Sequence, residues 1–379
     1  MDNGLNGSVK AQFENADCLH FKKYRALSPL PQPHVVAGVP VRQPDQPASM
    51  IRIDLVSAWS RSISPRAWDE FASRCGGSFL SSWTVVRLAR ITNRVLIVKF
   101  YRSTTTDRTL IGQCAISVTR KEIRFLDRLL LLPEYVDDEW ADCIDALINY
   151  FGPRVYRYGS HWNEEPPRAL HPSPLHAIEQ SWARDFHIDA VNFGHWESFS
   201  HYTRSISNNI CRDHTKAVRL GNATVKIRHG WSALRDLGAL VRARRHVMQK
   251  NHQSISFISD IILHATKILV FGKHVCLFTS SVNSEKYSSV FCVSFGSCLY
   301  YISGGVLPNK AGLGSFVMLK TLETWQTRYP HGRFVMGFHT GQTSPEEYTV
   351  GAALYRRKLR VTSRTGLEFI LTVNKQCLM

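Results

Sequence analysis

The sequence lacks the motifs of several large enzyme classes. It contains no GxSxG, Walker A, HExxH or strand-initiated GxGxxG pattern, which excludes the usual hydrolase, P-loop, zincin and Rossmann sites. None of its nine cysteines stands in a CxxC pair, so zinc ribbons and thioredoxin-like redox sites are excluded as well. No cluster of His, Cys and Asp has the spacing of metal ligands, and we expect no metal.

Long apolar runs are also missing. The longest, such as Leu129–Pro133 and Ile268–Phe271, are far shorter than the roughly 20 residues of a membrane-spanning helix. The N-terminus shows no charged leader followed by an apolar core, as a signal peptide would. Scattered cysteines, odd in number, fit a reducing compartment. We therefore expect a cytoplasmic protein without a transmembrane segment.

Acidic residues are scarce, and the shortage is local. Lysine and arginine outnumber acids 47 to 30, which gives a net charge of +17 and favours an anionic partner. Between His201 and Lys250 the only acids are Asp213 and Asp236. In the expected helix Ser205–Leu220, three cations share one face: Arg212, Lys216 and Arg219. This stripe predicts contact with a polyanion such as tRNA, and a solvated helix face is the alternative interpretation.

The chain is long enough for two domains. Residues 1–50 are rich in proline and are expected to form a disordered leader. We expect an N-terminal domain over 51–165, a proline-rich linker over 166–187 and a C-terminal domain over 188–379. The pattern predicts consecutive strands at Ile268–Phe271, Val275–Ser280, Ser288–Phe295 and Leu299–Gly304, and a closing strand at Leu367–Val373.

The most informative stretch is Cys298–Leu319. A strand-like run leads into a loop with Gly312 and Gly314, and a helix begins near Ser315. Glycines let a phosphate approach the backbone, and the helix N-terminus attracts an anion. This pattern predicts an anion site, and an ordinary strand–helix turn is the alternative. The candidate cofactor-binding residues are Gly305, Val306, Asn309, Gly312, Gly314 and Ser315.

Three segments resemble Fem-like and cellulose-biosynthesis-type acetyltransferases of the GNAT superfamily. They are Gly76–Ala89, Ser205–Ile227 and the stretch from Tyr300 to about residue 359. The resemblance implies an α/β (α+β) fold of two tandem GNAT-like domains, each with a mixed, mostly antiparallel sheet flanked by helices. It also implies that the C-terminal domain holds the acyl donor, whereas the N-terminal domain, without a phosphate-binding glycine loop, is not catalytic.

The sequence departs from the family pattern at three places. Asn309 stands where the family has Gln or Arg, and His339 ends a strand that usually ends in an acid. Tyr355-Arg356 stands in place of Tyr-Lys, and Arg356 adds to the anion-binding candidates.

The chemistry of acyl transfer selects three catalytic candidates. The resemblance implies that two strands part and that the acyl arm lies between them, with Tyr301–Val306 as the donor-side edge. His339 could act as a general base, Glu347 could share this task, and Tyr355 could protonate the leaving group. The alternative roles are a strand-end histidine, a helix-start charge and core packing.

Three functions are compatible with these residues. The first is transfer of an acyl group from acyl-CoA to an amine or hydroxyl of a small-molecule or peptide acceptor. The second is a Fem-type aminoacyl transfer from aminoacyl-tRNA bound to the basic stripe. The third is a non-catalytic GNAT-like scaffold. A purely nucleic-acid-binding module has no recognisable helix-turn-helix, zinc-finger or RNA-recognition signature to support it.

Overall fold

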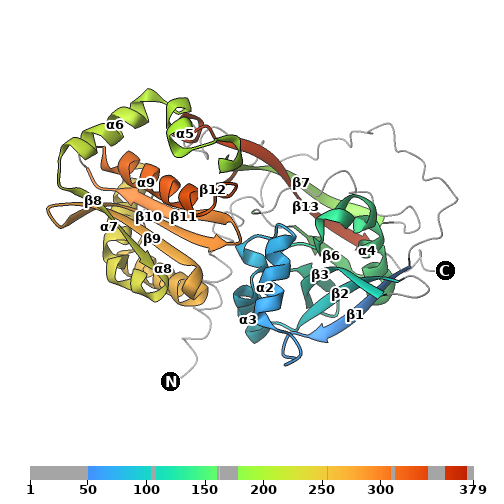
Figure 1. Ribbon diagram of the computed structural model, residues 1–379. Coiled ribbons are helices and arrows are strands. Elements are labelled where there is room, and N and C mark those ends of the chain that lie inside the picture. The colour runs from blue at the N-terminus through green and yellow to red at the C-terminus, as the bar shows by residue number, and fades with distance from the viewer. Residues whose placement is uncertain are drawn as a thin grey trace, which may run out of the picture. The chain divides into compact units, whose positions relative to one another are not determined.

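The computed structural model describes residues 50–103, 108–159, 162, 178–253, 255–308, 312–339 and 355–373 (Figure 1). The expected leader lies outside these ranges except for Met50, which begins the first strand. Most of the expected linker, residues 166–177, also lies outside them. Its remaining residues, 178–187, belong to a long strand.

The first half of the described chain combines helices with a short antiparallel meander. Its elements are β1 (Met50–Ser57), α2 (Pro65–Arg74), η2 (Phe79–Ser81), α3 (Trp83–Thr92), β2 (Val95–Ser103), β3 (Arg108–Val118), β4 (Glu122–Phe125), β5 (Leu130–Leu131), η3 (Pro133–Tyr135), α4 (Val136–Phe151) and β6 (Val155–Tyr158). Helix α2 begins as the sequence indicates, because the Ser64 side chain accepts a hydrogen bond from the Ala67 N–H and Pro65 stands at the first helical position.

The second half contains the segment singled out above. Its elements are β7 (Ile178–Asn192), η4 (Phe193–His195), α5 (Phe199–Ser205), α6 (Asn208–Arg219), β8 (Ala223–His229), η5 (Gly230–Asp236), α7 (Leu237–Lys250), α8 (Phe257–Phe271), η6 (Gly272–His274), β9 (Val275–Val282), β10 (Glu285–Phe295), β11 (Cys298–Val306), α9 (Leu313–Arg328), β12 (Arg333–His339) and β13 (Thr362–Val373). A short helical turn, Tyr355–Lys358, precedes β13.

Both halves repeat one order of elements. A strand and two helices precede three antiparallel strands, a long helix follows, and the next strand pairs in parallel with the third strand. The meanders are β2–β3–β4 and β9–β10–β11, and the parallel pairs are β4–β6 and β11–β12. All other pairs among the described strands are antiparallel. The repeat is thus visible in the pairing, although the two halves share no evident sequence identity.

Strands β7 and β13 connect the two sheets. They pair with each other along the whole of β13, while β13 also pairs with β6 and β7 also pairs with β12. The last strand therefore lies inside the sheet order, between β6 and β7. The strand expected at Leu367–Val373 is the second part of β13. Its flanking strands could not be predicted, because alternation along one strand does not determine which distant strands pair with it.

The expectation of a strand at Ile268–Phe271 is wrong. This run is the last turn of helix α8. Apolar positions at helical spacing, from Phe257 through Ile261 and Ala265 to Ile268, pack against α7 and the sheet. The four-residue apolar run looked like a strand because the polar residues that interrupt the earlier turns hid the longer helical period.

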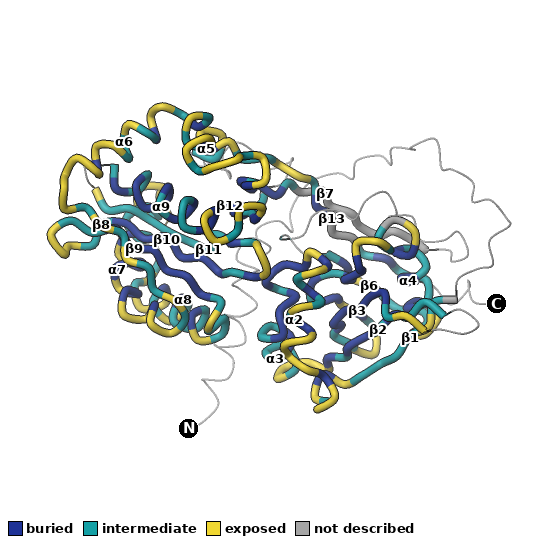
Figure 2. The backbone as a smooth tube through the Cα atoms, in the orientation of Figure 1, coloured by how far each residue is buried: buried dark blue, intermediate teal, exposed yellow. Residues whose placement is uncertain are grey.

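Two layers of helices enclose the sheet of the second half. Helices α5, α6 and α9 cover one face through a cluster that includes Tyr202, Ile210 and Val317. Helices α7 and α8 cover the other face through Leu240, Val241 and Ile268 (Figure 1). Figure 2 shows β9 and β10 largely buried between them, whereas β8 and most of β11 are less buried. No helix in the described ranges is long and apolar enough to cross a membrane.

Candidate functional site

Strands β11 and β12 part in the middle of the second sheet. They pair in parallel only from Cys298–Tyr300 to Arg333–Val335. Beyond this point β11 continues along β10 as far as Val306, whereas β12 follows β7. Helix α9 comes after β11 and begins at Leu313. The separation lies where the family resemblance placed the acyl arm.

A bulge marks each of the two parting strands. In β11 the register against β10 shifts so that Ile302 has no partner, while Tyr301 faces Cys292 and Ser303 faces Phe291. In β12 the register against β7 shifts between Val335 and Gly337. Bulges bend a strand and re-aim its side chains. Both strands therefore bend just after their pairing ends.

Two glycines of the expected cofactor loop are required by packing. A Cβ atom on Gly305 would lie 2.3 Å from the backbone carbonyl of Ala243, so β11 and α7 touch through their backbones there. Gly312 has φ +69° and caps α9, and its Cβ would lie 2.4 Å from the backbone oxygen of Asp213 in α6. These close approaches explain both glycines without a ligand.

Gly314 differs from these two. A Cβ atom there would meet Val306 at 3.6 Å, which is an ordinary contact. The N–H groups of Gly314 and the half-buried Ser315 belong to the first turn of α9, where backbone donors have no partner within the helix. This turn holds no acidic side chain. Helix α4, its counterpart in the first half, begins instead with Val-Asp-Asp-Glu.

Three tyrosines gather on the α9 side of β11. Tyr301, Tyr355 and Tyr202 belong to the same apolar cluster, and the Tyr202 hydroxyl donates to the backbone oxygen of Leu359 at 2.9 Å. Burial raises the pKa of Tyr301 to about 12, against the opposing effect of Arg356 and Arg244. Burial, together with nearby Tyr301 and Asp213, also raises the pKa of Tyr355 well above its usual value. The Tyr355 phenol thus keeps its proton at neutral pH.

Arg356 is held by an internal ion pair. Its guanidinium donates to Asp189 Oδ2 at 2.8 Å, and the Ser363 hydroxyl donates to the other oxygen of the same carboxylate. Asp189 is 3% exposed. The same guanidinium packs against Gly337, where a Cβ would lie 3.0 Å from it. This charge, proposed from the sequence as an anion ligand, is thus already balanced by a buried carboxylate.

The basic stripe on α6 is exposed. Arg212, Lys216 and Arg219 all reach solvent, and the first two make only local bonds, to Asn209 at 3.1 Å and Asp213 at 3.4 Å. The backbone of Asp213 touches Gly312, so α6 lies directly beside the start of α9. The stripe and the glycine loop are therefore neighbours.

Three predicted site residues cannot be placed with their side chains. Asn309 and Glu347 lie outside the described residues, as does the side chain of His339. The backbone of His339 ends β12 opposite His187 of β7.

The structure brings together residues that the sequence analysis missed. His264 Nε2 lies 2.7 Å from Ser303 Oγ, and His264 Nδ1 lies 3.2 Å from Asp260 Oδ1. Arg244 donates to the same Asp260 oxygen. The available signal was the i, i+4 spacing of Asp260 and His264, which puts both on one helical face once α8 is recognised. Within the described ranges, no group of three or more His, Cys, Asp or Glu residues could hold a metal.

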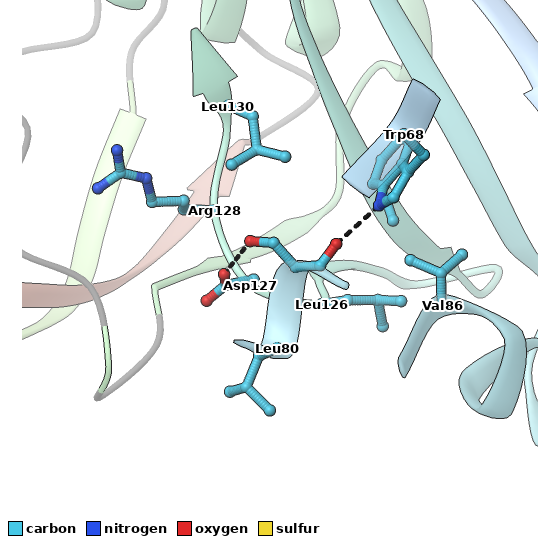
Figure 3. Close-up of a pocket in the computed structure, with 9 residues that line it drawn as sticks. Trp68, Leu80, Val86, Leu126, Asp127, Arg128 and Leu130 are labelled. Atoms are coloured by element: carbon cyan, nitrogen blue, oxygen red, sulfur yellow. Dashed lines mark hydrogen bonds between the residues drawn. The ribbon is translucent and has the colours of Figure 1, made fainter. Parts of the chain in front are cut away.

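The first half contains a small internal cavity (Figure 3). It has a volume of about 10 Å³ and is lined by residues including Trp68, Asp127 and Arg128. Ser78 and Ser81 donate to the Asp127 carboxylate, and Trp68 Nε1 donates to the Ser81 backbone oxygen at 2.7 Å. A cavity with room for about one water, lined mostly by apolar side chains, does not suit an acyl donor.

Comparison with solved structures identifies the fold. FemX superposes with a TM-score of 0.58 at 9% identity, over 86% of this chain and 98% of its own. A protein of unknown function from Bacteroides thetaiotaomicron has a TM-score of 0.49 at 8% identity, over 83% and 99%. A tandem GNAT protein from the clavulanic acid biosynthesis pathway has a TM-score of 0.43 at 8% identity, over 86% and 98%.

The sequence itself matches no protein-family model and no curated protein. The chain nevertheless has the Fem-like fold of two tandem GNAT-like domains, because its likeness to FemX spans both halves. The predicted fold class, an α/β arrangement with mixed, mostly antiparallel sheets flanked by helices, is confirmed.

Proposed function

We propose that the protein is an acyltransferase that moves an acyl group from acyl-CoA to an amine or hydroxyl. One observation carries the proposal: β11 and β12 part after Tyr300 and Val335, and the end of β11 at Val306 lies beside Gly314 in the first turn of α9, which holds no acid. The helix end suits a pyrophosphate, and the parted strands offer a backbone edge for the acyl arm.

The donor would bind along β11 and α9. The backbone donors of Gly312, Gly314 and Ser315 would hold the pyrophosphate, with Val306 beside Gly314. Asn309 is proposed as a further ligand. Backbone atoms of α7 and α6 already occupy the space next to Gly305 and Gly312. Gly314 is therefore the glycine at which a phosphate could approach the backbone closely. The edge from Tyr301 to Val306 would face the pantetheine and acyl group.

Acyl transfer needs a base, an acid and stabilisation of the carbonyl oxygen. Tyr355 is proposed as the acid that protonates the departing thiolate, since its raised pKa keeps it protonated. His339 and Glu347 are proposed to accept the proton of the acceptor. The first half is proposed to be non-catalytic, because acidic residues occupy the start of α4.

A second candidate is a Fem-type aminoacyl transfer from aminoacyl-tRNA. The observation that favours it is the exposed stripe of Arg212, Lys216 and Arg219, which lies next to the glycine loop. Such cations neutralise phosphates and would bind a tRNA end in a salt-dependent way.

Thermal unfolding with acetyl-CoA, longer acyl-CoAs and bulk aminoacyl-tRNA tests these proposals. We expect saturable stabilisation by a CoA thioester, and its loss in Gly314→Glu, because a carboxylate at the α9 N-terminus would repel the pyrophosphate, while the new Cβ would make only an ordinary contact with Val306. Gly238→Glu is the matched control, since Gly238 is likewise the second residue of a helix and has open space around it.

The two donors predict different results. Stabilisation by aminoacyl-tRNA alone, lost at high salt, would replace the CoA donor by the second candidate. If neither donor stabilises the wild-type protein, the acyltransferase proposal fails and a non-catalytic scaffold takes its place.

A further inference from the structure

We propose that Ser303 is a nucleophile activated by His264 and Asp260, and that it carries the acyl group as a serine ester during transfer. The inference rests on the proposed acyltransferase function and specifies its mechanism. Ser303 Oγ lies 2.7 Å from His264 Nε2, and His264 Nδ1 lies 3.2 Å from Asp260 Oδ1. A hydroxyl, a base within reach and a third group that orients the base form the signature of an activated nucleophile.

The hydrogen-bond partners determine the direction of each bond. His264 Nδ1 has two acceptors beside it, the Asp260 carboxylate and the Asp260 backbone oxygen at 3.0 Å. In the neutral imidazole these two acceptors hold the proton on Nδ1, which leaves Nε2 as an acceptor. In this tautomer the Ser303 hydroxyl donates to Nε2. This is the tautomer that draws a proton away from a nucleophilic oxygen.

The bulge in β11 aims Ser303 at this histidine. Strict alternation would put Ser303 on the same face as Tyr301, which packs on the α9 side. Because the register shifts at Ile302, Ser303 instead contacts His264 of α8 on the opposite face, where Ile302 also packs. Ser303 lies three residues beyond Tyr300, where pairing with β12 ends. The hydroxyl is therefore on the segment that would border the acyl arm.

The three residues of the proposed triad differ in how far they are buried. Asp260 is 0% and His264 is 1% exposed, whereas Ser303 is half-buried. The Phe291 ring packs edge-on against the imidazole at 5.7 Å. Although burial alone would raise the pKa of Asp260, bonds from His264 and Arg244 lower it, so the carboxylate stays charged. The ionised, enclosed acid holds the imidazole, and Ser303 is the residue of the three that is only half-buried.

The proposed reaction has two balanced steps. In the first, Ser303 Oγ attacks the thioester carbonyl, His264 Nε2 takes the hydroxyl proton, and the C–S bond breaks. The departing sulfur receives that proton, which yields free CoA thiol and an acyl-serine ester. In the second, the acceptor amine or hydroxyl attacks the ester, its proton passes through His264 to Ser303 Oγ, and the C–O bond breaks. His264 thus replaces Tyr355 as the acid in this route.

A fluorophosphonate probe tests the activated serine independently of any acyl donor. We expect the wild-type protein to be labelled at Ser303, with labelling lost in Ser303→Ala and slowed about 10²–10⁴-fold in His264→Ala. Ser280→Ala is the control, because Ser280 is a buried serine of β9 whose hydroxyl has no partner among the described residues. An unlabelled Ser303 in folded wild-type protein would overturn the inference.

Intact-mass analysis with acyl-CoA and no acceptor tests the ester itself. We expect release of CoA thiol with an adduct of one acyl group, mapped to the β11 peptide in the wild type and absent in Ser303→Ala. Stabilisation by CoA thioesters without any adduct would refute the covalent route and leave the proposed function intact. Fluorophosphonate labelling without CoA binding would instead support the activated serine and contradict the CoA donor.

Discussion

Replacing Gly305 by alanine should destabilise the protein through a backbone contact. The new Cβ would lie 2.3 Å from the carbonyl carbon and oxygen of Ala243 and 2.4 Å from the Arg244 nitrogen. Because backbone atoms cannot rotate away, a normal separation of about 3.5 Å requires α7 and β11 to move apart by roughly 1 Å. We expect a loss of about 1–3 kcal/mol in the free energy of unfolding, as for other overpacked cores.

Gly314→Ala is the matched comparison. Its Cβ would meet Val306 at 3.6 Å and would replace glycine by the best helix former, so we expect unchanged or slightly higher stability. Urea unfolding followed by far-UV circular dichroism measures both variants. A Gly305→Ala protein as stable as the wild type, or a Gly314→Ala protein destabilised as strongly as Gly305→Ala, would refute the packing explanation of these glycines.

Three further outcomes are expected. Asp189→Asn should lower the urea midpoint by the equivalent of up to about 3–5 kcal/mol, because it leaves the largely buried Arg356 guanidinium without its counter-charge; a midpoint like that of the wild type would contradict this. Burial would raise the pKa of Asp236, but bonds from Lys286 and Arg228 lower it overall, so this carboxylate stabilises the fold above its unfolded pKa of about 4. The stability difference between the wild type and Asp236→Asn should therefore be constant near neutral pH and shrink as the pH falls below about 4, and a difference independent of pH would refute the ion-pair account. If tRNA binds the α6 stripe, replacing Arg212 and Arg219 by alanine should weaken its retention and reduce the slope of log affinity against log salt by about 0.7–0.9 per lost phosphate contact, whereas an unchanged slope would place the tRNA elsewhere.

The order of strands and helix along the chain around the glycine loop could be predicted, because local sequence patterns determine it. Alternating apolar residues, the loop glycines and the amphipathic segment after Leu313 identify β10, β11 and α9 within a few residues. The same use of local patterns gave a wrong prediction at α8, because the short apolar run Ile268–Phe271 was interpreted as a strand although it is the end of a helix. Periodicity over fifteen residues, not four, distinguishes the two.

The side-chain constellation at Ser303 was beyond sequence reasoning for a different reason. Asp260 and His264 lie about forty residues before Ser303, and the contact depends on a bulge that shifts one side chain to the opposite face. No local sequence pattern predicts a β-bulge at this position. Likewise, the glycines at 305 and 312 suggested a ligand, whereas their nearest neighbours are the backbones of α7 and α6.

The position of β13 constrains the order in which the chain can fold during synthesis. Strand β6 is complete by Tyr158, yet the partner on its open side, residues Phe369–Thr372, is made more than two hundred residues later. Until then the first half presents an unpaired strand edge, a surface to which other chains can add. A ribosome-bound or truncated first half should therefore depend on a chaperone, and the pairing of β13 with β6 and β7 should be the event that completes both sheets.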